Sequence, residues 1–136
     1  MSGGGLTRVN PDDLAAPSGF SHAVVARGGA LVFLAGQTAL DRSGTVIDGD
    51  LVRQFERALE NLLAALSAAG GQPEHLARLT VYVVDPADYR RRAADIGAVW
   101  RRLAGQDYPA MALLGIVRLW DEPALVELEG IAVLPK

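Results

Sequence analysis

Two amphipathic helical segments, set among apolar strands, constrain most strongly what this chain can fold into. The first follows Asp50, a residue type that favours the N-cap of a helix, and ends at Gly70-Gly71. Its apolar residues fall on one helical face: Phe55, Leu59, Leu62, Leu63 and Leu66. The second begins after Asp85-Pro86, ends at Gly105, and has one face formed by Tyr89, Ala93, Ile96, Trp100 and Leu103. Each helix therefore buries one side against one face of a sheet.

Apolar and β-branched segments around these helices predict the strands of that sheet. They are Phe20–Arg27, Ala30–Ala35, Leu79–Val84, Met111–Val117 and Ala124–Leu134. Gly28-Gly29 between the first two indicates a hairpin turn. The predicted order is β-β-α-β-α-β-β, an α+β fold with both helices on one face of the sheet. The strands are apolar on both faces, so we expect an oligomer that covers the other face.

Composition narrows the class of protein further. The chain has 136 residues, the size of one domain. Its net charge of −3 gives no basic footprint, so we expect no nucleic-acid partner. It has no cysteine and two histidines, which excludes disulfides and cysteine nucleophiles, and we expect no metal and no cofactor. No signal peptide and no apolar run near about 18 residues is evident, so we expect a cytoplasmic protein that does not span a membrane.

The segment from Leu125 to Val133 carries the most informative chemistry, because two acids interrupt an apolar strand. Alternate residues of a strand share a face, so Glu127 and Glu129 are predicted to point the same way. A buried carboxylate needs a partner, water or a raised pKa, and such a group in a cleft is a candidate acid–base. The alternative is that both contact arginine or solvent at a sheet edge.

Two further segments offer weaker signals. Gly36 ends a buried strand, where it allows close approach of a backbone or a ligand; the alternative is a simple bulge before a turn. His22 lies where the first strand begins, and the alternative there is a strand-edge histidine without catalytic duty. His75, in the turn after the first helix, is predicted to be a surface residue.

Together these segments resemble the RidA family, also called YjgF or L-PSP. The matching stretches are Gly19–Val24, Leu34–Gln37, Gln54 with Ala58–Leu62, Ala68–Gly70, Leu79–Val83, Pro109–Ala110 and Val126–Ala132. Each is short, but their order and spacing are specific. Residues 1–18 are expected to form a flexible N-terminal segment that begins with Ser2-Gly3-Gly4-Gly5, and residues 19–136 a RidA-like domain.

The resemblance implies a chorismate-mutase-like fold. It also implies a homotrimer whose sheets pack into a central barrel, with helices outside and ligand clefts between subunits. Active members hydrolyse reactive enamine or imine metabolites such as 2-aminoacrylate. In them an arginine in P-A-R-[ST] grips the substrate carboxylate, the first glutamate of E-x-E positions or activates water, and an N-terminal aromatic and the S-G-Q backbone complete the cleft.

This sequence departs from that pattern at three positions. Met111 stands at the position of the arginine, Phe20 at that of the tyrosine, and Ala35 at that of the serine. A thioether cannot hold a carboxylate as a guanidinium does, so the resemblance implies a less polar ligand. Arg118, the nearest downstream cation, is seven residues from Met111 and is expected to face the other way.

The resemblance thus implies one catalytic and five substrate-binding candidates. They are Glu127 as the catalytic residue, with Phe20, His22, Ala35, Gly36 and Met111 in the binding site. Two functions stay open: hydrolysis of enamine- or imine-type metabolites, or a non-catalytic trimeric module that binds a small-molecule metabolite. Ribonuclease activity, attached by name to some members, is disfavoured because the chain is acidic.

Overall fold

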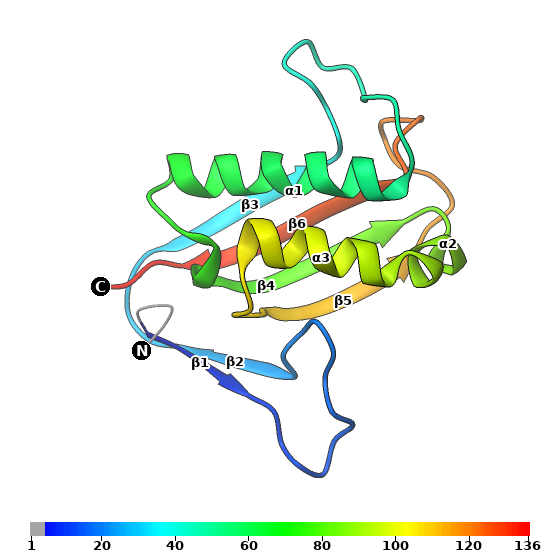
Figure 1. Ribbon diagram of the computed structural model, residues 1–136. Coiled ribbons are helices and arrows are strands. Elements are labelled where there is room, and N and C mark those ends of the chain that lie inside the picture. Colours follow the sequence, from blue (N-terminus) through cyan, green and yellow to red (C-terminus); the bar gives the residue numbers. More distant parts are fainter. Residues whose placement is uncertain (1–4) are drawn as a thin grey trace.

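A computed structural model describes residues 5–136 of the chain, and residues 2–4 of the predicted flexible start lie outside them (Figure 1). The elements are β1 (Leu6–Val9), β2 (Ala23–Ala26), β3 (Leu31–Gln37), α1 (Leu51–Ala68), the 3₁₀ turn η2 (Pro73–His75), β4 (Leu76–Val83), α2 (Pro86–Arg91), α3 (Ala93–Ala104), β5 (Ala110–Gly115) and β6 (Val126–Val133).

The main sheet has the strand order β3-β6-β4-β5, in which only the β4–β5 pair is parallel. Figure 1 shows α1 and α3 lying across one face of this sheet. On β6 the residues facing the helices, Val126 and Leu128, are buried, while Glu127 and Glu129 lie on the other face and are half-buried. The predicted α+β fold with helices on one face is confirmed.

Helix α1 begins and packs as its sequence predicts. The Asp50 side chain accepts a hydrogen bond from the backbone N–H of Arg53 at 3.0 Å, which caps the first turn. The helix ends at Ala68, and Gly70 follows with φ +92°, a conformation that favours glycine. Its apolar face lies in the centre of the core, where Phe55, Leu59, Leu62 and Leu66 are fully buried.

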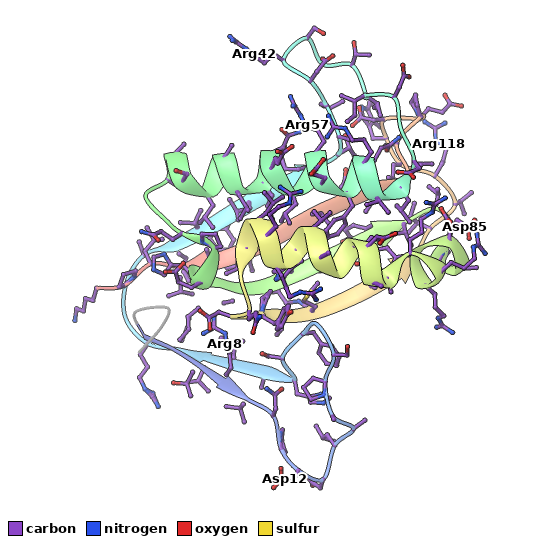
Figure 2. The ribbon with its side chains drawn as sticks, viewed as in Figure 1. Arg8, Asp12, Arg42, Arg57, Asp85 and Arg118 are labelled. Carbon is purple, nitrogen blue, oxygen red and sulfur yellow. The ribbon has the colours of Figure 1, made fainter. Side chains whose placement is uncertain are left out.

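The predicted hairpin at Gly28-Gly29 is wrong. Both glycines turn the chain, with φ +63° and +80°, but β2 on one side pairs with β1 in a separate two-stranded sheet. The strand β1 was not expected from the sequence. Arg8 holds it in place, since its guanidinium donates to the carbonyl oxygens of Glu74 and Asp107 (Figure 2).

The second helix divides at Arg92 into α2 and α3, which follow one another along the same side of the sheet. Asp85 caps α2 by accepting from the backbone N–H of Asp88 at 3.1 Å. The prediction that His75 is a surface residue is wrong. Its ring is buried, because Nδ1 accepts a hydrogen bond from the Gln72 N–H at 3.0 Å and folds the ring into the turn.

The sheet face opposite the helices carries apolar side chains that the chain itself does not cover. Phe33 is 72 % exposed and Leu31 on the same strand 60 %. The uncovered apolar face expected from the sequence is therefore present. Of the helices in residues 5–136, none has the length and apolarity needed to cross a membrane.

Candidate functional site

The close approach of Gly36 and Glu127 forms the centre of the candidate site. The β3–β6 register shifts between Leu34 and Gln37, so that Ala35 and Gly36 form a β-bulge. A Cβ atom at Gly36 would lie only 2.8 Å from Cδ and Oε2 of Glu127. The bulge and the close approach thus occur together, and only a glycine leaves the Glu127 carboxylate its present position.

Glu127 and Glu129 point to the same face, as predicted, but their surroundings differ. The Tyr82 hydroxyl donates a hydrogen bond to Oε1 of Glu129. Within residues 5–136, Glu127 receives no such bond, and neither carboxylate forms an ion pair with arginine. Burial raises the pKa of Glu127, and the negative charges of Glu129 and Asp121 raise it further. Two neighbouring acids in different surroundings are typical of acid–base sites.

Three polar side chains position the strand ends that carry this pair. Gln54 of α1 is buried, and its Oε1 accepts from the backbone N–H of Leu125, just ahead of β6. Asn61 of the same helix donates to the carbonyl oxygen of Thr38, just beyond β3. The Thr38 hydroxyl in turn donates to Asp121 at 2.7 Å, which fixes the loop before β6 beside the end of β3.

Phe20, His22 and Met111 form a second group at the start of β5. Ser21 donates through its N–H to Pro109 O at 2.9 Å, which joins the N-terminal segment to this strand. The rings of Phe20 and His22 meet edge to face, 5.1 Å apart. The His22 Nε2 atom lies 2.7 Å from the carbonyl oxygen of Ala15, so His22 braces the N-terminal loop.

The two groups do not meet within one chain. Met111 pairs with Leu79, a core residue, and therefore faces the helices. Glu127 pairs with Tyr82 and faces the other side of the sheet. The partners Leu79 and Tyr82 are three residues apart on β4, about 10 Å along the strand. The chain thus brings together Glu127, Ala35 and Gly36, and separately Phe20, His22 and Met111.

Met111 lines a cavity of about 480 Å³ between β5 and α3. Along the sequence, Arg118 is the nearest cation downstream of Met111. Arg118 instead lies in the loop after β5, with Nε donating to Leu119 O, at the end of the sheet where α1 begins (Figure 2). The cation that lines the Met111 cavity is Arg101 of α3. Arg101 follows Gly97 by four residues and Ala93 by eight, so these three residues lie on one helical face. This spacing is visible in the sequence.

In the described part of the chain, histidine, aspartate and glutamate side chains do not gather in any group of three suited to a metal ion.

Comparison with known proteins places this chain among a large set of relatives. The sequence profile of the family described as endoribonuclease L-PSP matches residues 11–134. Protein DfrA of Myxococcus xanthus is 35% identical over 115 residues, 84% of each chain. A RutC family protein of Pyrococcus horikoshii is 33% identical over 114 residues, 83% of this chain and 85% of the relative.

Solved structures are also similar to this chain. The crystal structure of the Rid family protein YyfB from Yersinia pestis, described as of unknown function, superposes with a TM-score of 0.85 at 33% identity. It covers 96% of this chain and 99% of its own. RidA from an Antarctic Psychrobacter species superposes with a TM-score of 0.68 at 27% identity, over 88% of this chain and 92% of its own.

Proposed function

This chain belongs to the endoribonuclease L-PSP family, also called the RidA or YjgF family, and from that premise we propose that it is a homotrimer that hydrolyses an enamine- or imine-type metabolite in clefts between subunits. Glu127 is the acid–base of this reaction. Gly36 gives the substrate access to the carboxylate, and Met111 with the Phe20 segment forms the apolar wall of the cleft.

The raised pKa of Glu127 is the observation that carries the proposal. A carboxyl group with a raised pKa keeps its proton closer to neutral pH and can both give and take one. The neighbouring Glu129 carboxylate accepts a hydrogen bond from the Tyr82 hydroxyl, whereas Glu127 does not within residues 5–136, so we assign the two acids different roles. Burial is the first cause of the shift, which supports a site partly withdrawn from water.

The reaction balances with one water and one proton carrier. The Glu127 carboxylic acid protonates the β-carbon of the enamine, and the C=C electron pair forms that C–H bond, which leaves an iminium ion. The Glu127 carboxylate then takes a proton from water as the water oxygen bonds to the iminium carbon. The C–N bond of this carbinolamine breaks, ammonia leaves with a proton from Glu127, the hydroxyl group returns its proton to the Glu127 carboxylate, and a carbonyl compound remains.

The separation of the two groups of site residues within one chain supports assembly into an oligomer. Met111 lies on the edge strand β5, and the segment that carries Phe20 and His22 joins this strand through a bridge between Ser21 and Ala110. Glu127 and Gly36 lie on the other half of the sheet. A second subunit can place one group opposite the other. The uncovered face also holds a groove of about 360 Å³ lined by Phe33, Arg78, Glu129 and Ile131, which a partner sheet would fill.

The hydrolysis test uses imines generated in place by an amino-acid oxidase from alanine and from leucine. The wild-type chain is expected to accelerate loss of the imine, with the larger apolar side chain preferred because Met111 replaces a cation. Glu127→Gln is expected to lower this rate by about 100-fold or more, the usual contribution of a general acid–base. Glu60→Gln, on the exposed side of α1, is the matched control. Equal rates for all three proteins, at the buffer background, would contradict the proposal.

A second function, a trimeric module that binds a metabolite without turnover, is favoured by Met111 itself. Without an arginine at that position, a small carboxylate substrate loses one charge-assisted hydrogen bond, about 10- to 150-fold in affinity. Thermal unfolding across a metabolite panel tests this function. A saturable rise in melting temperature without any imine hydrolysis supports it, and no rise with any metabolite counts against it.

A further inference from the structure

The cavity beside Met111 is built like a ligand pocket. Its volume of about 480 Å³ falls in the range of small-molecule sites. Four aromatic rings form much of its wall, in two contacting pairs. Phe55 meets Tyr89 edge to face at 6.2 Å, and Trp100 stacks on Tyr108 at 6.3 Å. Such a wall favours a planar apolar group.

Small residues on α3 keep this space open. Ala93, Ala94 and Gly97 line the pocket between the larger Tyr89 and Trp100. A glycine in the interior of a helix is unfavourable, so its presence calls for a packing reason. A Cβ at Gly97 would lie 3.3 Å from Nη1 of Arg101, which shows that the guanidinium folds back over Gly97 at the pocket wall.

Trp100 supplies an independent observation. It lines the pocket and is only 5 % exposed, yet its indole Nε1–H has no hydrogen-bond partner in the described part of the chain. Buried donors are almost always paired in folded proteins, so an unpaired one at a cavity needs an explanation. A ligand atom that accepts a hydrogen bond, after a small movement of the ring, provides one.

Arg101 supplies the charge. Among residues 5–136 it forms no ion pair, whereas Arg102 next to it pairs with Glu56 of α1. The alternative is that Arg101 only complements the dipole at the end of α3, a role that Arg102 shares.

We propose that the Met111 pocket binds a small aromatic carboxylic acid, with the ring against Trp100 and Tyr108 and the carboxylate on Arg101. This inference deepens the proposed function and rests on it, because it takes Met111 as part of the same cleft. The substrate class is then an enamine or imine acid with an aromatic side chain. The cation that holds the acid group comes from α3 instead of from position 111.

The experiment titrates the full-length protein with 2-naphthoate and follows the indole N–H signals of Trp100 and Trp120 by ¹H–¹⁵N NMR, assigned with Trp120→Phe. The Trp100 signal is expected to shift saturably. The Trp120 signal, from an indole that is 91 % exposed in the loop before β6, is expected to stay in place. 2-Naphthylmethanol, of the same shape without the charge, is expected to bind at least about tenfold more weakly, the value of one charge-assisted hydrogen bond.

Arg101→Gln is expected to weaken naphthoate binding by about tenfold or more and to leave naphthylmethanol binding unchanged. Arg102→Gln, with the same charge change on the same helix, is expected to leave both unchanged. No shift of the Trp100 signal at millimolar naphthoate, or equal weakening by the two variants, overturns the pocket assignment. The naphthoate titration is repeated with Glu127→Gln, because this variant separates binding in the Met111 pocket from the proposed imine hydrolysis. Intact naphthoate binding with no imine hydrolysis by the wild type overturns the function alone, and hydrolysis without any Trp100 shift overturns the pocket alone.

Discussion

The backbone of Gly36 lies so close to the side chain of Glu127 that a Cβ at residue 36 would stand 2.8 Å from the carboxylate carbon. A side chain at residue 36 would therefore move the carboxylate, not the backbone. The carboxylate is the flexible end of a side chain, so it can yield without unfolding the strand. Position 36 thus sets where the Glu127 carboxylate lies without strongly affecting the fold.

The first prediction follows for Gly36→Ala. The φ of Gly36 is not in the left-handed region, so alanine meets only the steric contact with Glu127. Imine hydrolysis is expected to fall by about 100-fold, the cost of a catalytic group displaced by about 1 Å. The melting temperature is expected to change little. Ala30→Ser, at an exposed position just before β3, is the control. An unchanged rate in Gly36→Ala would contradict the assignment of Glu127.

The second prediction concerns the pH dependence of stability. The folded-state pKa of Glu127 is raised above its ordinary value of 4.5, so the folded chain holds this proton in a window where the unfolded chain has released it. Stability therefore falls as the pH rises from 4.5 through the folded-state pKa and then levels off. Glu127→Gln is expected to remove this fall and to melt above the wild type at neutral pH, but not at acid pH.

Asp41 provides a control in which the pH dependence of stability has the opposite sign. Hydrogen bonds from Thr45 and Ser43 lower the pKa of Asp41, so its contribution is present at neutral pH and is lost as the pH falls through the folded-state pKa. Asp41→Asn is expected to lower the melting temperature at neutral pH. Parallel melting curves across pH for both variants and the wild type would refute this account.

The third prediction concerns the hydrogen bond from Tyr82 to Glu129. Tyr82→Phe is expected to lower the free energy of unfolding by about 0.5–1 kcal/mol, since both residues are half-buried and water replaces part of the bond. The bond raises the pKa of Tyr82 above 10.0, so its contribution holds below pH 10.0 and is lost at higher pH. Urea unfolding of the two single variants and the double variant Tyr82→Phe with Glu129→Gln measures the coupling; additive effects would show that the bond contributes nothing.

The fourth prediction tests the assembly. Phe33→Asp places a charge in the uncovered apolar face and is expected to convert the proposed trimer to a monomer, as measured by light scattering after size-exclusion chromatography. Ala64→Asp, on the exposed surface of α1, is the matched control and is expected to remain a trimer. A trimer in both variants would exclude this face from the interface.

The fifth prediction concerns the apolar residue at position 111. Met111→Arg is expected to raise the affinity for a small carboxylate such as pyruvate by about 10- to 150-fold, the value of a charge-assisted hydrogen bond. Met111→Leu keeps the volume and the apolar character and is expected to leave that affinity unchanged. Calorimetric titrations that give equal affinities for both variants would place the carboxylate away from residue 111.

The sequence predicts the elements whose signal is local. Helix α1 has a cap at Asp50 and a long apolar face, and both are observed. The strand β1 has four residues, and it is tied to the rest of the chain by Arg8, which reaches two distant carbonyl groups. The glycines at 28 and 29 show that the chain turns, but not that the strands on either side enter different sheets. Non-local pairing of this kind leaves no periodic signal.

The candidate site likewise has some features that the sequence predicts and others that it does not. Alternation along one strand is enough to place Glu127 and Glu129 together on one face. The face to which Met111 points depends on the parallel register of β5 with β4, which the sequence does not reveal. The strand pattern around Met111 does not predict Arg101, because this cation reaches the pocket from helix α3.

The parallel pairing of β4 with β5 also has a consequence for how the site forms. Parallel neighbours need a crossover, and here it consists of α2 and α3, so most of the pocket wall, from Tyr89 to Met111, comes from one stretch, with Phe55 and the Ser18-Gly19 segment added from elsewhere. Contacts between residues near in sequence cost little loop-closure entropy and form early in folding, whereas Gly36 and Glu127 meet only when distant parts of the chain have come together. Hydrogen exchange during refolding is therefore expected to protect β4 and α3 before β3, so that most of the pocket wall forms before Gly36 and Glu127 meet.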